Sequence, residues 1–186
     1  MFEFLKANPA VAMLKEDHDR VQSLFDHFEA TKGRATKRKI VREAIMELKI
    51  HAAIEEELFY PAVRKAVGKE LMHEADEEHH VAKLLIAELD AMDGSESHFD
   101  AKFLVLAENV RHHIKEEENE MLPKARTAKL DFQTLAEKMQ RRKERLQKDG
   151  VPAPSEKRMV QASRGRGDSP ARAAKRKPPK LARKRT

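Results

Sequence analysis

The strongest constraint on this chain is a histidine–carboxylate motif that occurs twice, about sixty residues apart. His51 and Glu55 form the first copy, and His113 and Glu117 repeat the four-residue spacing. Each copy continues through a run of three glutamates to a hydrophobic pair and a proline. On a helix, residues four apart lie one turn above each other on the same face. The repetition therefore predicts two helices that contribute the two halves of one site.

Apolar residues share the helix face of the first motif. Leu48, Ile54 and Leu58 lie three or seven positions from His51 on that side, so the imidazole and the carboxylate point into an apolar environment. Burying such groups without partners costs roughly several kcal/mol. A bound metal ion removes this cost, and the motif therefore indicates a metal site.

Composition and periodicity favour an all-α chain. Glycine is scarce, with 6 residues in 186, and strong helix formers dominate. Helical spacing of the apolar residues predicts five helices, at about 9–30, 36–67, 69–92, 95–126 and 131–147. We expect the first four to form an up-down-up-down four-helix bundle and the fifth to cover one end or edge of it. Pro61 should kink or break the second helix, and Ser95 or Ser97 should cap the fourth.

Charge and composition divide the chain into three segments. We predict a bundle over 1–128, an accessory helix over 129–149 and a disordered basic tail over 150–186. Residues 157–186 contain twelve Lys or Arg and one Asp, a net +11, so residues 1–156 carry −5 of the total of +6. The tail has almost no large apolar residue and cannot bury enough surface to offset its ordering entropy.

One histidine of each bundle helix falls on the apolar face. His18 lies four positions after Leu14 and three before Val21. On the third helix, His79 shares its face with apolar residues, whereas the face of His80 is mostly polar, which favours His79 as the inward residue. Imidazole with carboxylate suits iron, manganese or zinc, and two bridging carboxylates suit a pair of ions. The predicted metal ligands are therefore His18, His51, Glu55, His79, His113 and Glu117.

Most of the other histidines and glutamates are expected at the surface. The remaining glutamates of the two runs are interpreted as a solvated face, with hydrogen bonds to ligand imidazoles as the alternative. These residues are Glu56, Glu57, Glu116 and Glu118. The histidines predicted to be exposed are His27, His73, His80, His98 and His112.

Taken together, these blocks resemble the hemerythrin-like HHE cation-binding domain family over about residues 11–127. The resemblance rests on Leu14–His18, His51–Glu57, Tyr60–Pro61, Glu78–His79 and His113–Glu118 with Pro123. It implies a four-helix bundle that binds two non-haem iron ions joined by an oxo or hydroxo bridge. Glu55 and Glu117 correspond to the bridging carboxylates of the family. The terminal ligands then correspond to His18, His51, His79 and His113.

One position departs from the oxygen-carrying members of that family, which place a second histidine one turn after the third-helix histidine. Lys83 occupies this position here. One iron ion therefore lacks a nitrogen ligand, which argues against reversible oxygen transport. Water, peroxide or Tyr60 remain as alternatives at that position, and packing at the bundle end is the simpler role for Tyr60.

The expected function is that of a di-iron protein that binds or senses oxygen, or breaks down peroxide in a catalase-like reaction. Iron storage or buffering without turnover would use the same ligands and stays open. A third hypothesis attaches the bundle to nucleic acid through the tail, whose Lys and Arg would neutralise phosphates without aromatic stacking. A merely solubilising tail is the alternative.

Several classes of protein are excluded or disfavoured. The absence of Cys excludes disulfides and thiolate metal sites. No apolar run reaches the ~18 residues of a membrane span, and the N-terminus lacks the apolar core of a signal peptide. We therefore expect a soluble, cytoplasmic protein without membrane contact, and its oligomeric state stays open.

Overall fold

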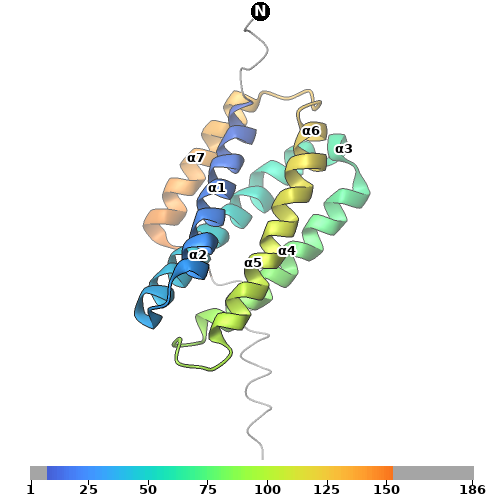
Figure 1. The fold of residues 1–186 in the computed structure, drawn as a ribbon. Helices are drawn as coiled ribbons and strands as arrows, with labels where there is room; N and C mark the ends of the chain where they lie inside the picture. The colour runs from blue at the N-terminus through green and yellow to red at the C-terminus, as the bar shows by residue number, and fades with distance from the viewer. Residues whose placement is uncertain (1–7, 153–186) are drawn as a thin grey trace, which may run out of the picture.

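The computed structural model describes residues 8–152. Most of the predicted basic tail, residues 153–186, lies outside this range, as do residues 1–7. The described chain is all-α, as predicted, and consists of a four-helix bundle with one further helix packed on its side (Figure 1). None of its helices combines the length and hydropathy needed to cross a membrane.

The bundle is built from two helical hairpins that pack side by side (Figure 1). In the first, α1 (Pro9–Ala30) runs antiparallel to α2 (Arg34–Ile54), which continues through the π-helical turn η1 (Glu55–Phe59) into α3 (Tyr60–Val67). The second pairs α4 (Lys69–Asp90) with α5 (Phe99–Glu116), η2 (Glu117–Met121) and α6 (Leu122–Ala125). Gly68 joins the two hairpins with φ at +100°, a backbone conformation that residues other than glycine rarely adopt.

Both motif helices widen into a π turn that begins at the motif glutamate. The Tyr60 N–H donates to the Glu55 carbonyl, and the Leu122 N–H donates to that of Glu117, five residues back in each case. Pro61 follows the first turn, and it interrupts the α-helical ladder because it lacks an N–H and crowds the preceding turn. The π turn absorbs this interruption, so the second helix runs on to Val67 and does not break at Pro61.

The fourth helix starts later than the sequence indicated, and the serine caps were wrong. α5 begins at Phe99 with His98 in the cap position and no side-chain cap. The Ser95 N–H instead donates to Asp93 Oδ1 at 2.7 Å, and Glu96 accepts from the amide of Gly94. Local carboxylate–amide bonds thus hold the chain in a turn before the helix can start.

The core consists of two apolar clusters with the predicted metal ligands between them. One contains Phe59, Met72 and Met139, and the other contains Phe25 and Phe103. The polar ligands therefore lie midway along the bundle, enclosed at both ends by closely packed hydrocarbon.

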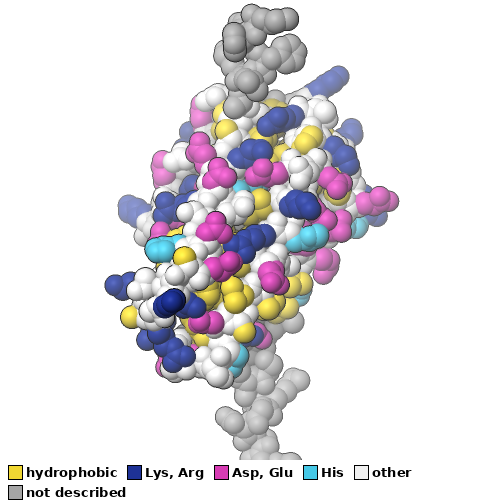
Figure 2. Space-filling view, in the orientation of Figure 1, with side chains coloured by type: hydrophobic (Ala, Val, Ile, Leu, Met, Phe, Trp, Pro, Cys, Tyr) yellow, Lys and Arg dark blue, Asp and Glu magenta, His cyan; other side chains and the backbone are white. Residues whose placement is uncertain are grey.

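The accessory helix α7 (Phe132–Asp149) packs against α1 and α2 (Figure 1). Its Arg142 makes a two-pronged ion pair with Glu57 at 2.7 and 2.8 Å, and Lys143 forms an ion pair with Asp17. These ion pairs tie α7 to the two helices that carry His18 and His51. More generally, acidic and basic side chains are interspersed on the face shown in Figure 2.

Candidate metal centre

The six predicted ligands converge in the middle of the bundle. His18 comes from α1, His51 from α2, His79 from α4 and His113 from α5, and each imidazole-bearing residue is at most 7% exposed. The glutamates of η1 and η2, Glu55 and Glu117, are both 0% exposed. Their inward orientation agrees with the helical spacing, whereas their role as metal ligands stays a prediction.

One group of four side chains could hold a single ion. His18, His51, Glu55 and Glu117 each present a ligand atom, and these atoms lie within 4.8 Å of one another. His18 Nε2 is 3.2 Å from His51 Nε2 and 3.1 Å from Glu117 Oε2. His51 Nε2 lies 3.2 Å from Glu55 Oε2.

A second group lies beside the first and shares Glu55 with it. His79 Nε2 is 3.3 Å from Glu55 Oε2 and 3.2 Å from His113 Nε2. The Tyr60 hydroxyl lies 3.3 Å from His79 Nε2 and 3.4 Å from His113 Nε2. The geometry thus divides the ligands into two adjoining groups that have one carboxylate in common.

Three further carboxylates accept hydrogen bonds from the outer nitrogens of imidazoles, and a fourth lies near the outer nitrogen of His51; each comes from a different helix than the imidazole. His18 Nδ1–H donates to Glu118 at 2.9 Å. The corresponding bonds run from His79 Nδ1–H to Glu56 at 2.9 Å and from His113 Nδ1–H to Glu78 at 2.7 Å, and Asp17 lies 3.6 Å from His51 Nδ1. The contacts close a ring around the bundle, from α1 to α2, α4, α5 and back to α1.

These carboxylates orient the imidazoles for metal binding. A histidine that donates Nδ1–H to a carboxylate presents Nε2 as an acceptor, which is the arrangement found at many metal sites. Three of the carboxylates are themselves paired with lysines: Glu118 with Lys15 at 2.7 Å, Glu56 with Lys83 at 2.6 Å, and Asp17 with Lys143. The lysines hold the carboxylates in place and offset their charge.

Two observations indicate that these imidazoles and carboxylates suit a metal ion. Two imidazole nitrogens bound ~2.0–2.1 Å from one ion are about 2.9–3.4 Å apart at octahedral or tetrahedral angles, and both histidine pairs have a separation of 3.2 Å. In addition, none of the four oxygens of Glu55 and Glu117 has a hydrogen-bond partner among the described residues, although all are buried. Acceptors that face one another without donors are costly to bury, and a cation between them would remove that cost.

Without a metal ion, protons would supply part of this positive charge. Burial alone would lower the pKa of His51, but the Glu55 charge and the contact with Asp17 outweigh burial and raise that pKa to about 10. Burial of His79 is likewise outweighed by Glu55 and Glu56, which raise its pKa to about 9. Although burial opposes it, attraction to these histidines holds the pKa of Glu55 well below its usual value. Metal binding must therefore displace protons.

Tyr60 packs in one of the apolar clusters, as the simpler expectation had it, and its hydroxyl also reaches the site histidines. In a π turn, hydrogen-bonded residues are five apart, so η1 brings the side chain of Tyr60 to the side of Glu55. Its burial and the charges of Glu117 and Glu55 raise the pKa of the hydroxyl well above its usual value. Tyr60 is thus a neutral hydrogen-bond donor unless a cation lies beside it.

Sequence reasoning underestimated the outer carboxylates. Glu56 and Glu118 each bond an imidazole, which was the alternative to a solvated face. Asp17 and Glu78 lie in the sequence blocks that carry the resemblance, but no role was assigned to them. A signal was present, because an acid directly precedes His18 and His79. Lys83, in place of a ligand histidine, pairs with Glu56.

Comparison with known proteins identifies relatives of most of the described chain. The model of the Hemerythrin HHE cation binding domain matches residues 10–125. A DNA nickase of Nostoc sp. is 27% identical over 107 residues, which cover 58% of this chain and 30% of that protein. An uncharacterized hemerythrin-like protein of Schizosaccharomyces pombe is 27% identical over 111 residues, which cover 58% of this chain and 55% of that one. The chain thus spans less than two-thirds of the length of either relative.

A solved structure supports the fold independently. The crystal structure of a hemerythrin HHE cation binding domain-containing protein from Mycobacterium kansasii is similar, with a TM-score of 0.61 and 22% sequence identity. The similarity covers 79% of this chain and 95% of that chain. At this identity, the likeness concerns the helical architecture alone.

Proposed function

We propose that this chain, which belongs to the hemerythrin HHE cation-binding domain family, holds a pair of iron ions between its four bundle helices. The carrying observation is that two imidazole pairs, each with nitrogens 3.2 Å apart, flank two fully buried carboxylates without hydrogen-bond partners among the described residues. One ion would be held by His18, His51, Glu55 and Glu117. The other would be held by Glu55, His79 and His113, beside Tyr60.

The proposed reactant is oxygen or a peroxide. An iron pair, when bound, supplies redox chemistry toward such molecules. The protein contributes by excluding water with its two apolar clusters and by fixing the imidazoles through the outer carboxylates. Tyr60 adds a neutral hydroxyl that can donate a hydrogen bond to an oxygen atom placed beside His79 and His113.

Sensing of oxygen or breakdown of peroxide fits this site better than bulk oxygen transport. Four side chains could hold the first proposed ion, but among the described residues only three could hold the second, with the neutral Tyr60 hydroxyl beside them. The second ion therefore has room for an added reactant. In the catalase-like reaction, two hydrogen peroxide molecules give two water molecules and one oxygen molecule, which balances without an external reductant.

The first experiment is metal analysis with an optical spectrum of iron-loaded protein. We expect two iron ions per chain and a ligand-to-metal absorption band in the near ultraviolet that changes when peroxide is added. A colourless protein with under half an equivalent of iron would refute the proposal. Oxygen evolution from peroxide, corrected for free iron, distinguishes turnover from storage or buffering of iron.

A second candidate function is attachment of this metal protein to nucleic acid. It is favoured by the net charge of +11 in residues 157–186, a segment that lies outside the described residues, and by the similarity of the bundle to part of a DNA nickase. The full chain should bind DNA at low salt and release it as salt rises. A chain without residues 153–186 should lose this binding and keep its metal, and equal binding by both chains would reject the tail as the attachment.

A further inference from the structure

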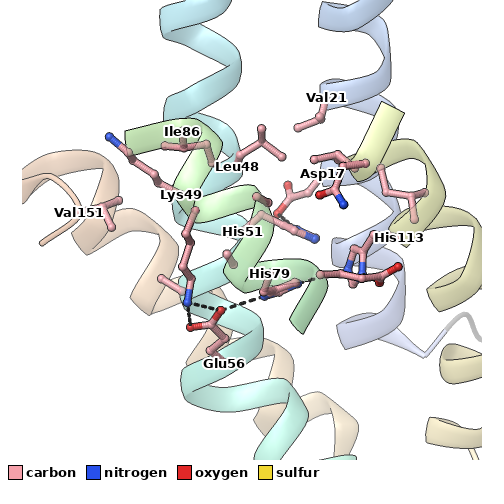
Figure 3. Close-up of a pocket in the computed structure, with 18 of the residues that line it drawn as sticks. Asp17, Val21, Leu48, Lys49, His51, Glu56, His79, Ile86, His113 and Val151 are labelled. Atoms are coloured by element: carbon pink, nitrogen blue, oxygen red, sulfur yellow. Dashed lines mark hydrogen bonds and ion pairs between the residues drawn. The ribbon is translucent and has the colours of Figure 1, made fainter. Parts of the chain in front are cut away.

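A pocket of about 320 Å³ lies beside the imidazoles of the candidate metal centre. The four site histidines line one part of it, whereas neither Glu55 nor Glu117 lines it. In Figure 3, Val21, Leu48 and Ile86 lie above His51, and His79 lies below it. Val110 and Ile114 of α5 extend this aliphatic wall. The pocket therefore has one polar side, formed by the site histidines and the carboxylates at their outer nitrogens, and one hydrocarbon side.

The size of the pocket exceeds what oxygen or hydrogen peroxide requires. A water molecule takes a share of ~30 Å³ in the liquid, and an apolar cavity of ~150 Å³ binds benzene. A peroxide molecule, with two oxygen atoms, would therefore leave most of the 320 Å³ unfilled. Water gains little at the aliphatic wall, which offers it no hydrogen bonds, so an apolar group is the better occupant of that part of the pocket. The volume matches an apolar molecule of about ten non-hydrogen atoms.

Asn109 supplies a polar contact point inside this pocket. It lies one turn before His113 on α5 and lines the pocket, and its Oδ1 is buried without a hydrogen-bond partner among the described residues. A buried acceptor is costly to leave unpaired. A hydroxyl or hydroperoxyl group of a ligand would provide the missing donor, next to the histidine side of the pocket.

The charged residues of the pocket argue for a neutral ligand. Two lysines line it, and both already have carboxylate partners: Lys49 pairs with Asp90, and Lys83 pairs with Glu56. The other carboxylates of the lining are likewise paired: Asp17 with Lys143, Glu57 with Arg142 and Glu78 with His113. A ligand carboxylate would have to compete with these ion pairs. An alcohol or a hydroperoxide needs no such exchange.

We propose that this pocket binds the hydrocarbon part of a neutral organic hydroperoxide or its alcohol, with the oxygen end toward Asn109 and the site histidines. This inference rests on the proposed function and deepens it, because it names organic peroxides as the class of reactant. The reactant is then recognised by its hydrocarbon body as well as by its oxygen atoms.

The test uses 2-phenyl-2-propanol, a stable alcohol of about ten non-hydrogen atoms, and the metal-loaded full chain. Isothermal titration calorimetry should show saturable binding of one molecule per chain. Val110→Phe places a larger side chain against the pocket and should weaken binding at least tenfold. The matched control is Val105→Phe on the same helix, where the native side chain is 52% exposed and binding should not change.

A second variant tests the orientation of the ligand and serves if Val110→Phe does not fold. Asn109→Leu keeps a similar side-chain volume and removes the acceptor, so it should weaken binding of the alcohol about three- to tenfold. Binding of cumene, which lacks the hydroxyl, should be unchanged or stronger. A general loss of packing would weaken both ligands alike and would overturn the role of Asn109.

Metal content and the optical response to hydrogen peroxide are measured on the same samples. Intact metal and peroxide response, with no binding of the alcohol or with equal binding by Val110→Phe, overturns the inference and leaves the proposed function standing. Binding of the alcohol that is lost in Val110→Phe, by a chain that takes up no iron, supports the pocket and rejects the proposed function instead.

Discussion

Replacing Glu55 with Gln tests whether one carboxylate serves both proposed ions. Glu55 Oε2 lies 3.2 Å from His51 Nε2 and 3.3 Å from His79 Nε2, so a single oxygen adjoins both ligand groups. Gln has nearly the same shape as Glu but carries no charge. The substitution therefore removes the shared charge from a fully buried position with little change in packing.

The magnitude follows from the repulsion between the two ions. Two divalent cations ~3.5–4 Å apart repel each other by roughly 17–19 kcal/mol at an effective dielectric constant of about 20. A carboxylate beside both ions offsets much of this repulsion, and in Glu55→Gln only Glu117 would remain to do so. We therefore expect the variant to hold no more than one ion per chain, where two are proposed for the native chain.

The loss of metal should also lower thermal stability. A ligand present at a hundred times its dissociation constant stabilises a folded protein by about 2.7 kcal/mol. For a chain of this length, 1 kcal/mol corresponds to roughly 2–4 °C in Tm. Loss of one such ion should lower the Tm in excess metal by roughly 5–11 °C, and loss of both should lower it further.

Metal analysis after desalting and thermal denaturation provide the readout, with two variants for comparison. His113→Ala removes a ligand from the second group only and should leave one ion per chain, because the first group keeps its four side chains. His112→Ala, at a neighbouring side chain that is 60% exposed, should keep both ions. If Glu55→Gln retained two ions, the shared carboxylate would be refuted.

Three further predictions concern the surroundings of the ligands. Glu56→Gln weakens the hydrogen bond to His79 Nδ1 and should reduce metal affinity about 10- to 100-fold in a chelator competition titration; an unchanged affinity would contradict the orienting role. Because the pKa of His51 is raised to about 10 and that of His79 to about 9, their contribution to the stability of the chelator-treated protein is present below pH ~6.5 and lost as pH rises through 9–10. The Tm of the chelator-treated protein should therefore be lower at pH 10 than at pH 7. In the metal-loaded protein these imidazoles are already neutral, so their deprotonation should not lower the Tm over this pH range. Tyr60→Phe removes a hydroxyl 3.3 Å from His79 Nε2 and should alter the optical response to peroxide while the fold, followed by circular dichroism, is retained; an identical response would place Tyr60 outside the chemistry.

Helical periodicity was sufficient to predict the inward-facing residues. The spacing of His51 and Glu55, and of His113 and Glu117, places each pair on one helix face, because the α-helical repeat is a local property of the chain. The apolar residues on its helix face also predicted that His79 points inward and His80 does not. His79 is 6% exposed, and His80 is half-buried. The all-α bundle followed from the same local patterns.

Only the tertiary structure decided which groups meet across helices. Asp17 faces His51 and Glu78 faces His113, although each carboxylate directly precedes a different site histidine in the chain. Such pairings depend on how the helices cross and on their relative height, which local periodicity does not contain. Tyr60 enters the site because a π turn changes the helical repeat at Glu55, and the apolar pocket exists only where four helices leave space between their side chains.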